Sequence, residues 1–361
     1  MPLIDHLPGR TLNINNEEYL FFSGTSYLGI GHQHAFKAAL IGAMSSYGTV
    51  YSASRNNNLQ LEIYHKTEKY LADVNHAESS VTLSSGLLAG QLAIKCFPEH
   101  QFIYAPNVHP ALWAESKIEM QFADYQDFCE RINNVVEAQL KPIVICCNSI
   151  DPLKCLSYDF GWIKSLPGDK DITLIFDDSH AIGIAGFTDI QNINTAHGIG
   201  NYYKYKKIAS AGVNIIVISS LAKAIGIPGG IIFGDTEFIE KVKKSPYFIG
   251  ASPIVPAYLH AFMHTAVLYS DALELLKRNI ALFISLNRKF LVYFRYLPEY
   301  PVFYAENEKL YEELLQRKIM ISSFAYPNPN DKPLTRIVLS ALHNEDDIKI
   351  LSNNISAIFT K

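Results

Sequence analysis

The stretch NIIVISSLAKAIG, residues 214–226, joins an apolar β-branched run to a small turn that contains a lysine. The run predicts a buried strand. Lys223 follows it among small side chains, where burial of an unpaired ammonium is costly or lowers its pKa. A surface lysine whose stem lies along apolar neighbours also fits this stretch. The rest of the chain decides between the two interpretations.

Short apolar runs recur along the first 250 residues, with helical or irregular stretches between them. This alternation predicts an α/β fold, in which a mainly parallel sheet is covered on both faces and the ligand site lies beyond the carboxyl ends of the strands. The predicted strands are residues 79–86, 101–106, 142–149, 172–180, 214–220 and 229–234. From residue 256 the pattern changes to long helices and then smaller strands, which predicts an α+β domain. We expect an N-terminal segment 1–35, a large domain 36–250 and a C-terminal domain 251–361.

Composition excludes several classes of partner. The 361 residues contain 31 Lys plus Arg and 35 Asp plus Glu, and the net charge of −4 gives no footprint for nucleic acid or an anionic membrane. No apolar run reaches the roughly 18 residues of a membrane span, and the N-terminus lacks the pattern of a secretory leader. The five cysteines are odd in number and form no CxxC pair, so the cytoplasm is the expected compartment.

Polar side chains follow the predicted strands at the edge where the ligand site is expected. They are Asn107, His109, Asn148, Asp177, Asp178, Ser179, His180, Ser219, Ser220 and Lys223. A buried carboxylate needs a cationic or hydrogen-bonding partner. Pyridoxal 5′-phosphate (PLP) supplies one, because its protonated ring nitrogen pairs with an acid and its aldehyde forms a Schiff base with a lysine. The segment SSGLLAG, residues 84–90, opens a predicted helix whose free N–H groups suit the phosphate.

Each of these residues has a simpler interpretation when it is taken alone. His109 fits a loop histidine, His180 a core residue, and Asp178 a structural, capping or surface residue. A metal hydrolase with Asp177, Asp178, His180 and His109 as ligands is a function of a different class. That hypothesis leaves Lys223 unexplained, so the joint pattern favours the cofactor site.

The order of these motifs resembles that of fold-type I PLP-dependent enzymes, and among them the α-oxoamine synthases, over nearly the whole chain. The motifs FDDSHAIGIAG (176–186) and SSLAKAIGIPGG (219–230) carry the most specific part of the resemblance. It implies a mainly parallel sheet of the seven-stranded type covered by helices, with a smaller α+β domain at the C-terminal end. It also implies PLP as the cofactor and a homodimer with shared active sites.

The resemblance implies a role for each matching residue. Lys223 would bind the cofactor covalently and move the substrate Cα proton. Asp177 would hold the ring nitrogen protonated, His109 would stack on the ring, and His180 would bond its phenolic oxygen. The residues implied around the phosphate are Ser85, the backbone N–H groups of Gly86 and Leu87, the Ser220 hydroxyl, and Ser252 from the partner subunit.

Three positions are implied on the substrate side. Arg336 matches the arginine that grips the amino-acid carboxylate. Ser26 stands where the family has Asn, and Asn148 stands where it has Glu, which removes a charge close to the cofactor. In addition, the family's Gly-Ser-Arg is Ala53-Ser54-Arg55 here. These departures leave the substrate contacts open.

The expected function is a PLP-dependent acyltransferase that condenses a small amino acid, L-alanine being favoured, with an acyl thioester of coenzyme A or acyl carrier protein and releases CO2. Within the family, this is most like the 8-amino-7-oxononanoate synthases of biotin formation. The alternatives are a synthase that uses glycine or serine, an aminotransferase, and a catalytically silent scaffold subunit.

Overall fold

The computed structural model describes residues 3–186, 197–326 and 330–360, which form two compact units. Unit 1 comprises Met1–Gln33, Asp151–Ser157 and Val267–Lys361, and unit 2 comprises His34–Ile150 and Tyr158–Ala266. The expected ranges 1–35, 36–250 and 251–361 follow the order of the chain, whereas each unit is assembled from separate segments. Within the described ranges, no helix is both long and apolar enough to cross a membrane.

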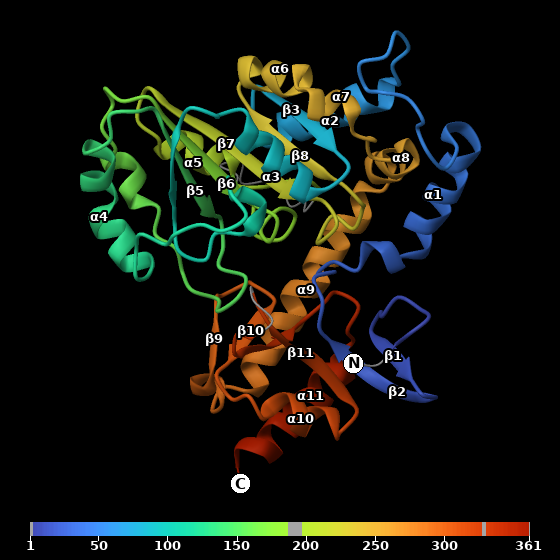
Figure 1. Ribbon diagram of the computed structural model, residues 1–361. Helices are drawn as coiled ribbons and strands as arrows, with labels where there is room; N and C mark the ends of the chain where they lie inside the picture. Colours follow the sequence, from blue (N-terminus) through green and yellow to red (C-terminus); the bar gives the residue numbers. More distant parts are fainter. Residues whose placement is uncertain (1–2, 187–196, 327–329, 361) are drawn as a thin grey trace. The chain divides into compact units, whose positions relative to one another are not determined.

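Unit 2 is built around a sheet with the strand order β3-β8-β7-β6-β5-β4 (Figure 1). The strands are β3 (Ser79–Leu83), β4 (Gln101–Tyr104), β5 (Ile143–Asn148), β6 (Ile172–Asp177), β7 (Val213–Ser220) and β8 (Gly230–Gly234). β4, β5, β6 and β7 are parallel, while β8 is antiparallel to both β7 and β3. The described residues place six strands in this sheet, one for each predicted apolar run, where the resemblance implied seven.

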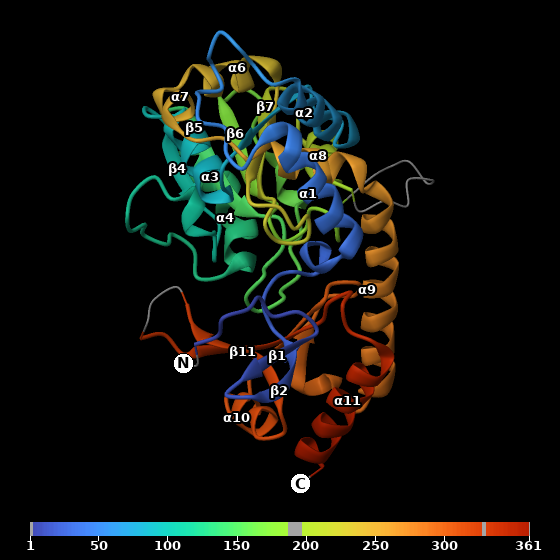
Figure 2. The same ribbon diagram turned by 90° about the vertical axis from the view of Figure 1, so that its right-hand side faces the viewer.

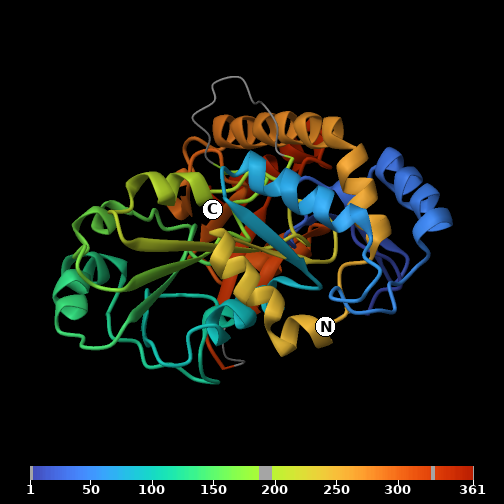
Figure 3. The same ribbon diagram turned by 90° about the horizontal axis from the view of Figure 1, so that it is seen from above.

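Helices cover both faces of this sheet, because its strands present apolar side chains on each face. The helices of unit 2 are α1 (His34–Tyr47), α2 (Glu62–Val74), α3 (Gly86–Lys95), η2 (Pro110–Leu112), α4 (Tyr125–Glu137), η3 (Gly161–Ser165), α5 (Tyr202–Ile208), α6 (Thr236–Lys244), α7 (Pro246–Gly250) and α8 (Pro256–His264). Figure 3 shows α6 and α2 on opposite sides of β3. In β6, Ile175 packs in a cluster with Leu92 of α3 and Ile239 of α6, whereas Phe176 stacks on Tyr205 of α5 at a centroid distance of 3.7 Å. Successive side chains of the strand therefore serve opposite faces.

Unit 1 contains a second sheet, with the order β1-β2-β11-β12-β10-β9. Its strands are β1 (Thr11–Ile14), β2 (Glu17–Phe22), β9 (Phe294–Tyr296), β10 (Val302–Ala305), β11 (Ile319–Ala325) and β12 (Pro333–Val338). The helices in this part of the chain are η1 (Ile30–His32), α9 (Ala266–Leu286), η4 (Leu291–Tyr293), α10 (Leu310–Leu315) and α11 (Glu345–Phe359). β2 runs parallel to β11, with Leu20 opposite Ile319, and Figure 2 shows these blue and red segments side by side. The N-terminal strands thus complete the C-terminal sheet.

Candidate active site

Asp177 is the last residue of β6 and lies at the carboxyl edge of the parallel strands. Its side chain is 7% exposed, and its Oδ1 accepts a hydrogen bond of 2.9 Å from the backbone N–H of Ser179. In the sheet register Asp177 stands between Asn148 of β5 and Ile218 of β7. The strand ends that carry the predicted site residues are therefore neighbours, as the sequence predicted.

Lys223 lies in the turn that follows β7. Two backbone hydrogen bonds, from Leu221 N–H to the Gly229 carbonyl (2.9 Å) and from Ile227 N–H to the Leu221 carbonyl (3.0 Å), close this turn. Burial lowers the pKa of Lys223, and the Asp177 carboxylate opposes that shift. The lysine is thus close enough to interact electrostatically with Asp177, and its neutral amine is easier to form than that of a surface lysine.

His109 precedes η2, in the loop that follows β4. Its Nδ1 accepts a hydrogen bond of 3.1 Å from the Ala111 N–H and lies 3.8 Å from Asp177 Oδ2. Burial lowers the pKa of His109, Asp177 raises it and Lys223 lowers it. Because Nδ1 acts as an acceptor, the ring is neutral with its proton on Nε2, and the contact with Asp177 is not an ion pair.

His180 and Ser179 lie in the turn directly after β6, and the sequence assigned a role only to His180. The Ser179 hydroxyl accepts a hydrogen bond of 2.7 Å from the backbone N–H of Ser220, which ties the end of β6 to the end of β7. Ser179 therefore helps to position the site. The sequence offered one signal for this role, its place inside the DDSH motif.

The predicted phosphate-binding residues come together at the start of α3. Ser85 is the N-cap and accepts a hydrogen bond of 3.1 Å from the Leu88 N–H, while the N–H groups of Gly86 and Leu87 belong to the unsatisfied first turn. A Cβ on Gly86 would lie 2.6 Å from Ser220 Cβ, so only glycine allows α3 to approach the end of β7 this closely. The Ser220 hydroxyl thus lies beside the positive end of a helix, where an anion is stabilised.

These residues fit PLP. A glycine allows the helix start to meet a serine hydroxyl, a buried carboxylate ends the central strand, and a buried lysine interacts with that carboxylate. A phosphate, a pyridinium nitrogen and an aldehyde need these three kinds of partner.

Asp178, next in sequence to Asp177, points into the protein instead. It is 1% exposed, and its two carboxylate oxygens accept hydrogen bonds from the Asn201 side chain (2.8 Å) and backbone N–H (3.0 Å). Burial raises the pKa of Asp178 to about 6. Asp178 is therefore structural, and the interpretation of it as a surface residue is wrong.

The described residues contain no group of three or more His, Cys, Asp or Glu placed to hold a metal ion. Asp177, Asp178, His180 and His109 all belong to this part of the chain, so the geometry does not supply the ligand set that the metal-hydrolase hypothesis requires.

Three further predicted residues belong to other segments of the chain. Arg336 and Ser26 belong to unit 1, where Arg336 in β12 is 7% exposed and donates a hydrogen bond to the Pro152 carbonyl, and Ser26 is exposed. Ser252 is exposed in the segment between α7 and α8 of unit 2. Their predicted contacts with substrate and with a partner's cofactor remain predictions.

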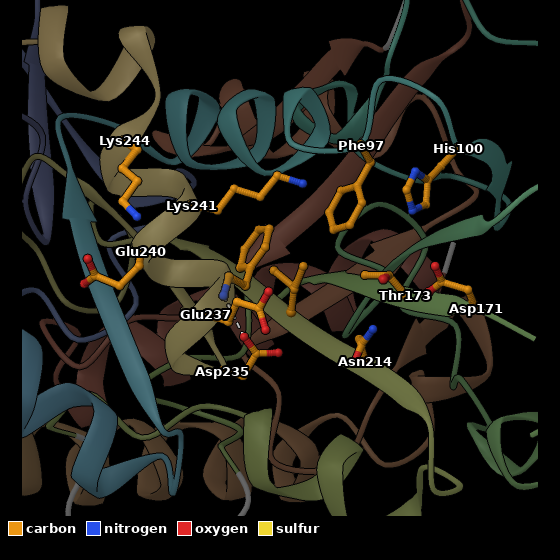
Figure 4. A pocket seen from close by; sticks show the side chains of 12 residues that line it. Phe97, His100, Asp171, Thr173, Asn214, Asp235, Glu237, Glu240, Lys241 and Lys244 are labelled. Atoms are coloured by element: carbon orange, nitrogen blue, oxygen red, sulfur yellow. Dashed lines mark hydrogen bonds between the residues drawn. The ribbon is translucent and has the colours of Figure 1, made fainter.

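A cavity of about 680 Å³ opens at the other edge of the unit 2 sheet, at the amino ends of β6 and β7 (Figure 4). It is lined by Phe97, His100, Asp171, Thr173, Asn214, Ile216, Asp235, Glu237, Phe238, Glu240, Lys241 and Lys244. Lys241 is engaged there by a hydrogen bond of 2.6 Å to the Cys96 carbonyl, and Asp235 caps α6. None of the predicted site residues lines this cavity.

Comparison with known families identifies the chain. The family described as Aminotransferase class I and II matches residues 51–355. The chain belongs to this family. Membership confirms the prediction of a PLP-dependent transferase.

Comparison with individual relatives indicates which type of enzyme within this family the chain resembles. An 8-amino-7-oxononanoate synthase from Petrotoga mobilis is 26% identical over 369 residues, covering 96% of this chain and 89% of that protein. A serine palmitoyltransferase from Bacteriovorax stolpii is 20% identical, covering 96% and 83%. These relatives confirm the predicted resemblance to the α-oxoamine synthases. Within its family, this protein is a transferase of the α-oxoamine synthase type.

Solved structures confirm the predicted fold-type I architecture. A serine palmitoyltransferase solved with PLP matches with a TM-score of 0.80 at 13% identity, covering 99% of this chain and 92% of that one. An 8-amino-7-oxononanoate synthase from Francisella tularensis matches with a TM-score of 0.71 at 19% identity, covering 95% and 98%.

Proposed function

We propose that this protein condenses a small amino acid with an acyl thioester and releases CO2 and free thiol, as an 8-amino-7-oxononanoate synthase does. L-Alanine is the favoured amino acid, and the acyl donor is a thioester of coenzyme A or of acyl carrier protein. The observation that carries the proposal is the meeting of Asp177, Lys223 and the start of α3 at one edge of the sheet. The Petrotoga mobilis relative, named for this activity, supports the choice of reaction.

The chain's own residues have distinct tasks in this proposal. Lys223 would hold the cofactor covalently; once the amino group of the substrate has displaced it, its freed amine, whose pKa is lowered by burial, would move the proton at the amino acid's Cα. Asp177 keeps the cofactor's ring nitrogen protonated, neutral His109 packs on the ring, and His180 bonds its phenolic oxygen. When bound, PLP supplies an electron sink for the electron pair left at Cα.

The remaining predicted residues orient the two ends of the reaction. Ser85, Gly86, Leu87 and Ser220 bind the phosphate through the positive end of α3 and a hydroxyl. Arg336 binds the amino-acid carboxylate, since its guanidinium can donate two parallel hydrogen bonds, and its Nε is buried without a partner among the described residues. Ser26 and Asn148 are the other two residues predicted on the substrate side.

We also propose that the enzyme is a cytoplasmic homodimer. Ser252 is exposed and follows α7, so its hydroxyl is available to the phosphate of the partner's cofactor. Exposed apolar side chains on the same unit, Leu59, Leu87, Tyr247 and Ile249, support an interface there.

Serine is the second candidate for the amino acid. Proteins named serine palmitoyltransferase are found both among the relatives in sequence and among the similar solved structures, and the solved one has the same fold as this chain. Glycine-using synthases, aminotransferases and a silent scaffold subunit are further outcomes of the test.

Substrate profiling tests the proposal. The PLP-loaded protein is incubated with L-alanine, glycine or L-serine, each with a medium-chain acyl thioester, and thiol, CO2 and oxo acid are measured. We expect thiol and CO2 in equal amounts, most with L-alanine, and negligible pyruvate. Stoichiometric oxo acid without thiol would identify an aminotransferase. A lack of spectral response to every amino acid would identify a silent subunit.

A further inference from the structure

Asn148 holds the loop that carries His109. It is the last residue of β5 and is 5% exposed. Its Oδ1 accepts a hydrogen bond of 3.1 Å from the backbone N–H of His109, and its Nδ2 donates one of 2.7 Å to the carbonyl of Asn107. A single side-chain amide therefore bonds the backbone on both sides of residue 108.

This loop needs such a support. The regular pairing of β4 with β5 continues only as far as the hydrogen bond from Ala105 N–H to the Cys146 carbonyl (2.9 Å). Asn107 then adopts a left-handed backbone conformation, with φ of +61°, which turns the chain toward the site. The two bonds from Asn148 fix the backbone immediately after this turn.

An amide suits this position and a carboxylate does not. The Asn107 carbonyl requires a donor, and a carboxylate can only accept when it is ionised. Asn148 also stands beside Asp177 in the sheet register, so an acidic residue here would place a second negative charge next to that carboxylate. Asp177 and Lys223 already act on the His109 ring, and an ionised side chain at residue 148 would add a third charge there.

We propose that Asn148 is a positioning residue that fixes His109 beside Asp177 without adding charge to the site. The uncharged amide at this position is then a working arrangement and not a loss of function. The inference rests on the proposed function only for the role of His109 on the cofactor ring. The placement of His109 is a property of the cofactor-free chain and can be tested there.

Two variants separate the two hydrogen bonds. Asn148→Ala removes both, so the His109 backbone amide should exchange its hydrogen about tenfold to hundredfold faster in the cofactor-free protein. Asn148→Asp keeps the acceptor for that amide but loses the donor and adds a charge. Its His109 amide should stay protected, while the pKa of the His109 ring rises.

Amide exchange is followed by mass spectrometry with fragment resolution, and the ring titration by NMR of histidine-labelled protein, with His109→Gln to assign the signal. Asn279→Ala is the matched control, because Asn279 is also buried and its amide also bonds two loop carbonyls, those of Ser340 and His343, at 3.0 and 2.9 Å in unit 1. Asn279→Ala should change neither the amide exchange rate of His109 nor the pKa of the His109 ring.

A folded Asn148→Ala protein with unchanged exchange at His109 would overturn the proposal, as would an equal change at His109 in Asn279→Ala. If Asn148→Ala does not fold, the Asn148→Asp variant decides. An unchanged pKa of the His109 ring in that variant would also overturn the proposal. A PLP-binding cycle of Asn148→Ala, His109→Ala and the double variant then tests the link to the cofactor, and the two losses in affinity should not add. Failure of the wild-type protein to bind PLP would refute the proposed function but leave the exchange result standing.

Discussion

Replacing Gly86 with alanine tests the phosphate site with a single methyl group. The new Cβ would lie 2.6 Å from Ser220 Cβ and 2.8 Å from Ser220 Cα, roughly 1 Å closer than carbon atoms in good contact. These atoms cannot rotate away, so the start of α3 must move from the end of β7. Overpacking of this kind lowers the free energy of unfolding by about 1–3 kcal/mol.

The same movement separates the N–H groups of α3 from the Ser220 hydroxyl. Loss of one hydrogen bond to a charged phosphate is worth about 1.5–3 kcal/mol, so we expect PLP affinity to fall about tenfold to hundredfold. Urea unfolding of the cofactor-free protein measures the first effect, and an absorbance titration with PLP measures the second.

Gly42→Ala is the control, because Gly42 lies in α1 and its added Cβ would meet no atom within 4 Å. This change should raise the free energy of unfolding by about 0.5–1 kcal/mol and leave PLP affinity unchanged. Wild-type PLP affinity in Gly86→Ala would refute the phosphate site. Wild-type stability would refute the close approach of α3 and β7.

Three further predictions concern single side chains. Lys223→Ala should abolish the covalent fixation of PLP by borohydride. Lys204→Ala is the control, because burial also lowers the pKa of Lys204, and this variant should still fix PLP. Fixation of PLP by Lys223→Ala would exclude Lys223 as the lysine that binds the cofactor. The folded state holds the Asp178 proton up to about pH 6 and the unfolded state only to about 3.8, so this group's stabilising effect is lost as pH rises through that window. Asp178→Asn should therefore gain roughly 3 kcal/mol relative to the wild type between pH 4 and 7 in urea unfolding, and a pH-independent difference would contradict the raised pKa. Lys223→Ala and Ser252→Ala subunits, mixed and refolded, should recover activity through one intact shared site, and no recovery above either parent would count against the shared site.

The sequence predicted those parts of the site that local patterns encode. The apolar runs located every strand of the unit 2 sheet, and the polar clusters after them located Asp177 and Lys223 at one edge. Parallel strands bring such clusters together without any knowledge of individual contacts. The phosphate site followed from a serine and a glycine at the start of a helix.

Contacts that depend on distant partners could not be predicted. β2 reads as a strand, but nothing in its composition names β11 as its neighbour. Asp177 and Asp178 have the same side chain, and only the packed fold shows that Asn201 donates a hydrogen bond to Asp178. Asn148 and Ser179 stood in motifs that the sequence singled out, but their roles rest on bonds to backbone groups of distant residues, and the motifs do not name those partners.

The division of unit 1 into separate segments also fixes the order in which the molecule is completed during synthesis. All of unit 2 has been made once residue 266 is added, but β2 must wait for β11, whose strand ends at Ala325. Synthesis of the stretch from residue 267 to residue 325, about 60 residues, takes roughly 3–12 s at typical translation rates of about 5–20 residues per second. During that interval the N-terminal strands have an open edge and no sheet to join, so the nascent chain exposes them to chaperones or to other copies of itself.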